Sequence, residues 1–377
     1  MHINSDLLRQ RIEACLILGA YGDALGAPVE FLDRAQIHAQ YTPKGIKHLA
    51  RAYGRVGAIT DDTQMTLFTA EGLLRALRRE MTRGIVHADS VVDYAYLRWL
   101  ATQGVSTELT ERALDPPSFL VQALGSYAPR APGNTCIGAL HRKTKVGAQA
   151  DNESKGNGGV MRIAPVAAFA AARDLPVEWV FNVGCQLAGL THGHPTGKVA
   201  SGFFAVLIYL ALTSESGDLR QITVDCLTQL ENGHFRTPAE NLLGIEETAE
   251  AVAIALDLSR SGDLQLELPS ELGQGWVAEE AVAIALYSAL LDAPTDRDRV
   301  CYAVNITGDS DSTGSMCGQI LGALHGPHAL TGIEDLEALE HLDLIRAVAH
   351  DLYDSMSWSY CEREGTAKAH SERYPPT

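Results

Sequence analysis

The chain has 377 residues, of which 46% are hydrophobic and only 6% aromatic, and this favours a large helical core over a β-sandwich or barrel. Its formal net charge of −17 argues against nucleic acid or an anionic membrane as the main partner, because both would repel it. The seven cysteines are odd in number and form no Cys-x-x-Cys motif, which argues against a disulfide framework or a zinc site.

The N-terminal residues lack the long apolar stretch and the small-residue cleavage site of a signal peptide. No stretch of 18 apolar residues occurs, so no membrane span is expected. Together with the cysteine pattern, these observations predict a cytoplasmic protein.

Apolar residues recur with a helical period along most of the chain, and no alternating run predicts a strand. Residues 19–28 predict a glycine-rich turn, and residues 104–135, rich in Pro and Gly, predict a long surface connection. Helices are predicted over residues 6–20, 62–80, 88–102, 164–172, 176–191, 197–213, 217–231, 239–258, 277–291, 296–305, 311–324 and 337–356.

The predicted fold is therefore all-α: a compact orthogonal multi-helix bundle with functional loops at helix N-termini. We expect one domain over residues 1–363 and a frayed tail over 364–377. The helix at 311–324 is rich in small residues, so neighbouring helices could approach it closely. These residues are Gly314, Ser315, Gly318, Gly322 and Ala323.

A first acidic cluster, Thr60-Asp61-Asp62-Thr63, stands directly before an apolar-periodic segment. Asp and Thr are favoured helix N-caps, so capping alone would explain one of these residues. Two consecutive carboxylates between two threonines exceed what one cap requires. Capping and metal binding are both compatible with this cluster taken alone.

A second acidic cluster, Asp309-Ser310-Asp311-Ser312, lies about 250 residues further along the chain and also opens a predicted helix. Alternating Asp-x-Asp in a loop points two carboxylates the same way, which is a common means of binding a hard cation. Uncompensated carboxylates at one point would repel each other, and divalent metals remove that cost. Oxygen donors favour Mg²⁺ or Mn²⁺ over zinc or copper.

Three further segments contain candidate site residues. Glu30 follows the glycine-rich turn and is a candidate metal ligand or general base, although a solvated loop Glu is the default interpretation. Asp23, inside the turn, could tie loop amides together. Residues 156–161 place glycines before a helix, which suits a phosphate. The spacing of His192 and His194 could suggest a metal site, but such a pair more often caps a helix or lines a pocket, and we favour a role in the loop.

Six stretches in this order resemble the ADP-ribosylglycohydrolase family, most closely its ADP-ribosylarginine hydrolases. Each stretch is modest alone, but together they span residues 19 to 326. The matching stretches are GAYGDALGAPVEF, GRVGAITDDTQMTLFTAEGLL, GNGGVMRIAPVA, LTHGHPTGKVASGFFA, GWVAEEAVAIALYSALL and NITGDSDSTGSMCGQILGALHG.

The resemblance implies an all-α fold with a cleft that holds two Mg²⁺ or Mn²⁺ ions. The implied metal ligands are Thr60, Asp61, Asp62, Asp309, Asp311 and Ser312. Glu30 falls on the family's mobile acidic residue near the metals. The implied loop for the ADP-ribose diphosphate consists of Gly156, Asn157, Gly158, Gly159, Val160 and Met161, with His192 as a further substrate contact.

The implied reaction is hydrolysis of the N-glycosidic bond between the distal ribose and an arginine of an ADP-ribosylated protein. Asp61, Asp62 and Glu30 are the candidate acid/base groups, and the sequence leaves open which of them acts. One departure concerns the dinitrogenase-reductase branch, which has an Asp where this chain has Ala131, before Gly133-Asn134-Thr135.

Other functions stay open on the sequence. A relative could hydrolyse serine-linked ADP-ribose, O-acetyl-ADP-ribose or poly-ADP-ribose, although Ser312 in place of Thr mildly disfavours the serine linkage. An immunity-type protein could occlude an ADP-ribosylating toxin, and the acidic composition would suit a basic partner. A metal-dependent phosphatase acting on ADP-ribose would share the ligands and differ in its products.

Overall fold

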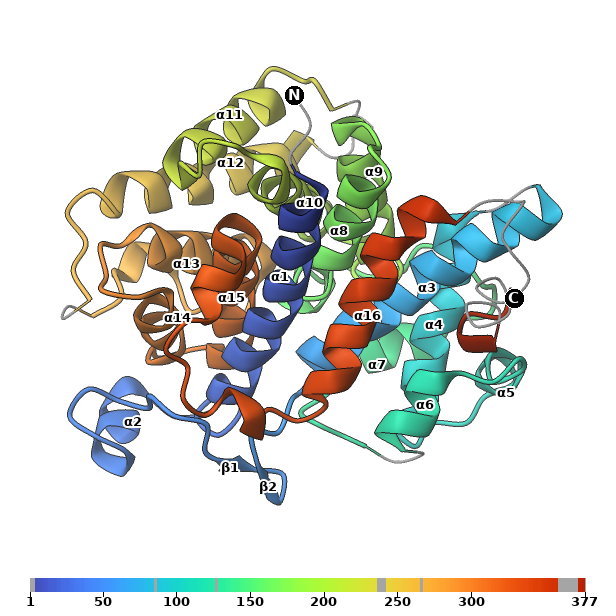
Figure 1. The fold of residues 1–377 in the computed structure, drawn as a ribbon, viewed down its shortest axis with the longest axis horizontal. Helices are drawn as coiled ribbons and strands as arrows, with labels where there is room; N and C mark the ends of the chain where they lie inside the picture. Colours follow the sequence, from blue (N-terminus) through green and yellow to red (C-terminus); the bar gives the residue numbers. More distant parts are fainter. Residues whose placement is uncertain are drawn as a thin grey trace.

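The computed structural model describes residues 4–84, 87–125, 128–235, 242–264, 267–358 and 372–376, and this part of the chain is dominated by helices (Figure 1). The α-helices are α1 (Ser5–Gly26), α2 (Arg34–Gln40), α3 (Asp61–Arg83), α4 (Ala88–Thr102), α5 (Glu108–Ala113), α6 (Phe119–Leu124), α7 (Asn134–His141), α8 (Ala164–Ala172), α9 (Val177–Gly189), α10 (Pro195–Thr213), α11 (Leu219–Glu231), α12 (Leu242–Leu258), α13 (Ala278–Leu290), α14 (Asp296–Val304), α15 (Ser310–His325) and α16 (Leu342–Asp354). The predicted all-α class is confirmed.

The strands described are two short ones, β1 (Arg51–Ala52) and β2 (Arg55–Val56), which pair antiparallel with Arg51 opposite Val56. Helix α2 and this hairpin are absent from the sequence prediction. Asp33 and Gln36 form a capping box at α2, in which Gln36 N donates to Asp33 Oδ1 at 2.8 Å. That pattern could have revealed the helix.

Helix α1 crosses the middle of the molecule and packs along α15 (Figure 1). The predicted turn at 19–28 is wrong, because α1 continues to Gly26. Its glycines serve close helix packing: a Cβ on Gly22 would lie 2.1 Å from the carbonyl oxygen of Gly314. From the other helix, a Cβ on Gly318 would lie 2.2 Å from the carbonyl oxygen of Leu18. The expected close approach to the helix at 311–324 is thus confirmed.

The surface connection predicted over residues 104–135 is also partly wrong, because it contains α5, α6 and the start of α7. Each of the first two helices has a side-chain cap. Thr110 N donates to Thr107 Oγ1 at 3.2 Å, and Val121 N donates to Ser118 Oγ at 3.4 Å. Such short helices bury few apolar residues, so they have little periodicity for a sequence pattern to detect.

Part of the predicted frayed tail is packed against the body. Tyr374 is fully buried, and its hydroxyl donates to Asp351 Oδ2 at 2.7 Å. Arg373 Nη1 donates to the same oxygen at 2.7 Å. The structure thus contradicts the predicted fraying for Arg373 and Tyr374, whereas residues 364–371 and 377 lie outside the described residues.

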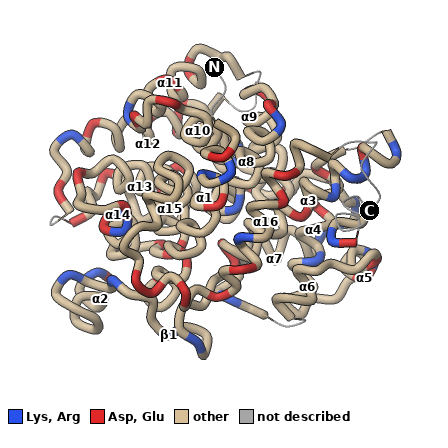
Figure 2. The backbone as a smooth tube through the Cα atoms, in the orientation of Figure 1, with Lys and Arg blue, Asp and Glu red and all other residues tan. Residues whose placement is uncertain are grey.

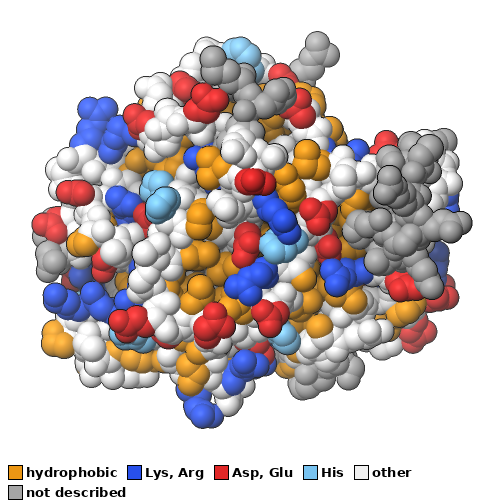
Figure 3. All heavy atoms as spheres, viewed as in Figure 1, with side chains coloured by type: hydrophobic (Ala, Val, Ile, Leu, Met, Phe, Trp, Pro, Cys, Tyr) orange, Lys and Arg blue, Asp and Glu red, His pale blue; other side chains and the backbone are white. Residues whose placement is uncertain are grey.

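Helix α10 is the one described helix that is long and apolar enough to cross a membrane by length and composition, yet most of it is buried inside the protein. It packs against α8, α9, α11, α12, α13 and α15, as a core helix does. On the face in Figure 3, basic and acidic side chains are interspersed. That face accordingly has none of the continuous basic surface that nucleic-acid binding requires.

Candidate active site

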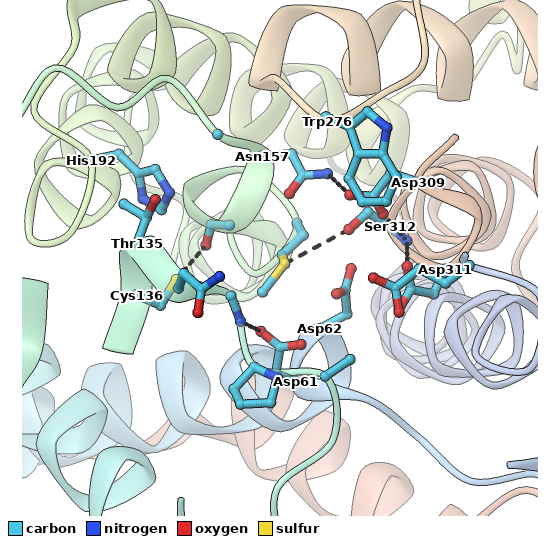
Figure 4. Close-up of a pocket in the computed structure, with 18 of the residues that line it drawn as sticks. Asp61, Asp62, Thr135, Cys136, Asn157, His192, Trp276, Asp309, Asp311 and Ser312 are labelled. Atoms are coloured by element: carbon cyan, nitrogen blue, oxygen red, sulfur yellow. Dashed lines mark hydrogen bonds between the residues drawn. The ribbon is translucent and has the colours of Figure 1, made fainter. Parts of the chain in front are cut away.

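A cavity of about 560 Å³ opens between the N-termini of α3 and α15 (Figure 4). It is large enough for a small-molecule ligand. Figure 2 shows acidic and basic residues spread along the described chain, with several acidic ones in the area between α2 and β1. The lining residues are Glu30, Phe31, Tyr53, Asp61, Asp62, Ala131, Pro132, Gly133, Asn134, Thr135, Cys136, Gly156, Asn157, Gly158, Met161, His192, Trp276, Asp309, Asp311 and Ser312.

The first acidic cluster begins α3, and Asp23 of α1 holds it in place. Thr60 is the N-cap, and its hydroxyl donates to Asp23 Oδ1 at 2.7 Å. The amides of Thr60 and Thr63 also donate to the Asp23 carboxylate. Asp61 Oδ2 accepts from Gly133 N at 3.2 Å, whereas Asp62 Oδ1 is buried without a partner. Asp61 and Asp62 therefore face the cavity, while Thr60 does not line it.

The second acidic cluster begins α15, with Asp309 as its N-cap. Asp309 Oδ2 accepts from Asn157 Nδ2 at 2.7 Å, which joins the cluster to the loop at 156–161. Asp311 and Ser312 follow on the first turn and face the same cavity. A Cβ on Gly26 would lie 2.4 Å from Asp311 Cα, so α1 fixes the position of this cluster too.

Glu30 joins the aspartates at the cavity wall. Burial, together with repulsion from Asp309 and Asp61, raises the pKa of Glu30 to about 9. Burial is also the main cause that raises the pKa of Asp61 to about 8, and it raises the pKa values of Asp62, Asp309 and Asp311. The cluster therefore retains protons at neutral pH unless cations compensate its charge.

We predict that the metal-free protein loses stability as pH rises from about 6.5 to 9. The folded-state pKa values of Glu30 and Asp61, about 9 and about 8, lie above their ordinary values of 4.5 and 3.8. Below the ordinary pKa values both carboxyls are protonated in the folded and in the unfolded chain. Between the ordinary and the folded-state pKa values only the folded protein keeps these protons, so its stability falls as pH rises through this range. Each proton contributes a slope of about 1.4 kcal/mol per pH unit. Chemical unfolding in EDTA at several pH values measures this slope.

The chosen pH range lies above the titration of His192. Burial and the charge of Arg162 lower the pKa of this residue to about 3. That residue changes the pH dependence only below about pH 6.5, its ordinary value. Glu30→Gln together with Asp61→Asn should flatten the slope, and saturating Mn²⁺ should stabilise the wild type more at pH 9 than at pH 6.5. A wild-type profile that is flat or rises over this window would contradict the prediction.

The donor chemistry of the cavity fits divalent cations. Carboxylate and hydroxyl oxygens are the ligands that Mg²⁺ and Mn²⁺ prefer, and both Asp62 Oδ1 and Glu30 Oε2 are buried with no hydrogen-bond partner. In the described residues, however, no three His, Cys, Asp or Glu side chains converge to hold a metal ion. The sequence-predicted ligands thus share one region, but Thr60 points toward Asp23 instead of the cavity.

The loop at 156–161 differs from the predicted helix start. Residues Asn157–Gly159 form a short 3₁₀ turn, and α8 begins only at Ala164. Gly156, Asn157, Gly158 and Met161 line the cavity, whereas Gly159 and Val160 are buried behind it. A Cβ on Gly158 would lie 2.8 Å from Cys136 Sγ and 3.1 Å from His192 Cε1, so a larger residue at this point of the wall would require these side chains to shift.

His192 lines the cavity, at the end opposite Asp309 and Asp311 (Figure 4). Its Nδ1 lies 2.8 Å from Thr191 Oγ1, which in turn accepts from Arg162 Nη2 at 2.7 Å. The lowered pKa keeps the imidazole neutral at physiological pH. His192 can therefore serve as a hydrogen-bonding group but not as a cation in this wall.

The sequence did not predict that the segment 131–136, which leads into α7, and three aromatic residues would line the cavity. This segment lay inside the predicted surface connection, yet Ala131 to Cys136 all line the cavity. Ala131 has a φ of 48°, a left-handed conformation that is uncommon for alanine. Burial raises the pKa of Cys136 to about 11, so this thiol is not an activated nucleophile. The three aromatic residues Phe31, Tyr53 and Trp276 also line the cavity, and no periodic pattern in the sequence indicated this position.

Comparison with known proteins adds relatives to this geometry. A model of the ADP-ribosylglycohydrolase family matches residues 4–361. The chain is 25% identical to the ADP-ribosyl-[dinitrogen reductase] glycohydrolase of Rhodospirillum rubrum over 81% of this chain and 83% of that one. It is 23% identical to the ADP-ribosylarginine hydrolase Tri1 of Serratia proteamaculans over 84% and 72%, respectively. A solved ADP-ribosylglycohydrolase-related protein complex shares the fold, with a TM-score of 0.61, 24% identity and coverage of 93% and 99%.

Proposed function

Since the chain belongs to the ADP-ribosylglycohydrolase family, we propose that it hydrolyses the N-glycosidic bond of ADP-ribosylated arginine in proteins and releases ADP-ribose. The observation that carries this proposal is the meeting of two acidic clusters, from α3 and α15, at the wall of one cavity together with Glu30. A similar relative is named as an ADP-ribosylarginine hydrolase, which supports arginine as the linkage.

Two Mg²⁺ or Mn²⁺ ions belong to this proposal. Asp61, Asp62, Asp309 and Asp311 would hold them, with the hydroxyl of Ser312 as a further donor, whereas the hydroxyl of Thr60 donates to Asp23 outside the cavity lining. Paired divalent ions supply a template for the ribose hydroxyls and Lewis acidity for the reaction. The unpartnered oxygens of Asp62 and Glu30 support this assignment, because buried carboxylate oxygens without partners are costly.

The residues of the chain position the substrate and move protons. Glu30 is a candidate to deliver a proton to the leaving guanidine nitrogen, because it lines the cavity and its Oε2 has no hydrogen-bond partner. Asp61 and Asp62 remain alternatives for the acid/base role. The walls at Gly156–Gly158 and His192 would hold the diphosphate, so that binding energy remote from the reacting carbon orients the ribose.

The same site supports two alternatives of lower rank. Another ADP-ribosyl linkage, such as serine or O-acetyl-ADP-ribose, would use the same clusters and differ in its leaving group. An immunity-type role, in which the protein occludes an ADP-ribosylating toxin, would need no turnover. We keep the cytoplasm as the proposed location, which the free and buried cysteines of the described residues support.

One experiment tests the proposal against its alternatives. The protein is incubated with arginine-linked and serine-linked ADP-ribosylated substrates, in Mg²⁺, Mn²⁺ or EDTA, and free ADP-ribose is followed. We expect release from the arginine substrate that EDTA abolishes. Preferential release from the serine substrate would replace the linkage, and no release from either would eliminate the enzymatic proposal in favour of a binding role.

A further inference from the structure

A second cavity, of about 280 Å³, lies between α2, at the lower left of Figure 1, and α14. Its walls come mainly from these two helices and from the segment at 43–47. Its lining shares no residue with that of the candidate active site. The proposed reaction therefore leaves this cavity without a role.

The charged side chains of this second cavity are mostly basic. Arg34, Lys44 and Lys47 bring three positive charges, whereas Asp298 is the one carboxylate among the described lining residues. Asp263 lies nearby in the chain but is not part of the lining. The lining thus has an excess of two positive charges, three less one, in a chain whose net charge is −17. Cations gathered at one point repel each other, and an anion between them removes that repulsion.

The carboxylates near these cations compensate little of their charge. Arg34 Nη1 lies 3.9 Å from Glu267 Oε1, but the Glu267 side chain is 88% exposed. Lys47 Nζ lies 3.8 Å from Asp298 Oδ1. In the part of the chain that the structure describes, Lys44 forms no ion pair. Long and solvated ion pairs contribute little, so these basic groups remain available to a ligand.

The side chain of Asn305 fixes the segment that carries both lysines. Ile46 N donates to Asn305 Oδ1 at 2.7 Å, and Asn305 Nδ2 donates to Ile46 O at 2.9 Å. Gly45 has a φ of 78°, and a Cβ there would lie 1.8 Å from Asn305 Oδ1, so this contact requires glycine. Lys44 and Lys47 therefore extend from a backbone that is held against the end of α14, which lowers the entropy cost of binding a ligand.

Arg34 is held on the opposite wall. Its backbone N donates to Thr307 Oγ1 at 3.0 Å, and its Nε donates to His38 Nε2 at 3.4 Å. These two contacts fix the start of α2 and orient the guanidinium. Among the described residues, none accepts a hydrogen bond from the two Nη groups of Arg34. Two parallel donors of this kind match the oxygens of a phosphate group.

We propose that this cavity is an anion site that binds a phosphate group, as inorganic phosphate or as the terminal phosphate of a small monoester. Arg34 donates to the phosphate oxygens from one wall, and Lys44 and Lys47 add positive charge from the other. A phosphate group has a charge of about −2, which matches the excess of two positive charges better than a carboxylate does. The site is separate from the proposed reaction, so either can fail without the other.

The test is isothermal titration calorimetry of the full chain in EDTA, so that phosphate cannot bind to divalent ions. We expect a Kd of about 1 mM or lower for inorganic phosphate or ribose 5-phosphate, and the tighter of the two identifies the source. Acetate should bind at least about fivefold more weakly. The Arg34→Gln/Lys44→Gln double variant should weaken phosphate binding about tenfold or more. Asp298→Asn should tighten it about two- to fivefold, because it removes the carboxylate that competes for Lys47.

Lys145→Gln is the matched control, because Lys145 is an exposed lysine outside this cavity, and it should leave the phosphate Kd unchanged. Circular dichroism checks that the variants fold. Should the double variant fail to fold, Lys44→Gln alone, at an exposed position, should still weaken binding about threefold or more. A second titration in saturating ADP-ribose separates this cavity from the candidate active site. Equal phosphate affinity in the double variant and the wild type, or phosphate binding that ADP-ribose abolishes, would overturn the proposed site.

Discussion

We expect Asp311→Asn to lower turnover of an arginine-linked ADP-ribosyl substrate by about 1,000-fold or more, the largest effect on activity of any single change. Asp311 is buried at the first turn of α15 and faces the cavity beside Ser312. An amide lacks the charge that a divalent ion requires, and such ions contribute several kcal/mol to the transition state. Release of free ADP-ribose, measured over time, gives the ratio.

The stability of the same variant, measured with and without metal, provides a second test. Burial and Glu30 raise the pKa of Asp311, so the metal-free wild type must protonate this carboxyl on folding at pH 8, whereas an amide needs no proton, and metal-free Asp311→Asn should therefore be the more stable form. Mn²⁺ should then raise its melting temperature less than that of the wild type. Asp225→Asn, on the exposed face of α11, is the control. Activity of Asp311→Asn within tenfold of wild type would exclude the proposed ligand role.

Gly22→Ala should destabilise the fold by about 2 kcal/mol or more, or prevent folding altogether. The added Cβ would lie 2.1 Å from the carbonyl oxygen of Gly314 and 2.9 Å from Ser315 N, and both are backbone atoms of α15 that cannot rotate away. Overpacking of this kind costs about 1–3 kcal/mol or more, whereas the gain in helix propensity is only about 1 kcal/mol. Chemical unfolding followed by circular dichroism measures the difference.

Gly138→Ala is the matched control for this prediction, because Gly138 is also inside a helix, α7. The nearest atom to its added Cβ is the Arg142 guanidinium at 3.0 Å, which is the mobile end of a long side chain. We expect this variant to be as stable as the wild type or slightly more stable. If both substitutions gave the same stability, close packing of α1 against α15 would not explain the glycines.

The long amphipathic helices and the acidic clusters could be predicted from the sequence because their signals are local. Helices at 88–102 and 164–172 have the predicted bounds, since their apolar residues and their ends lie within one short window of residues. Thr60 and Asp309 were recognisable as caps for the same reason. That the two clusters share a cavity is not a local property, and the resemblance to a family supplied it.

The missed features depend on contacts between distant segments. Gly19, Gly22 and Gly26 look like a turn because glycine favours turns, and only α15 shows why they stay helical. The segment Ala131–Cys136, a loop that leads into the first turn of α7, has no periodicity, and its place at the cavity follows from the bond between Gly133 N and Asp61 Oδ2. Trp276 can likewise be assigned to the cavity wall only from the structure, in which its ring stacks on Phe31 and its segment is bonded to Asp309.

Helix α1 contacts both halves of the candidate site. Its Asp23 accepts hydrogen bonds from the start of α3, and its Gly26 lies against Asp311 of α15. Its partner residues on α15 are about 290 residues away along the chain, a separation that makes closure of this contact slow. At a synthesis rate of about 5–20 residues per second, α15 therefore leaves the ribosome at least about 15 seconds after α1. Over that interval α3, α8 and α10 can already pack on α1, but the glycine-rich face of α1 that belongs against α15 has no native partner.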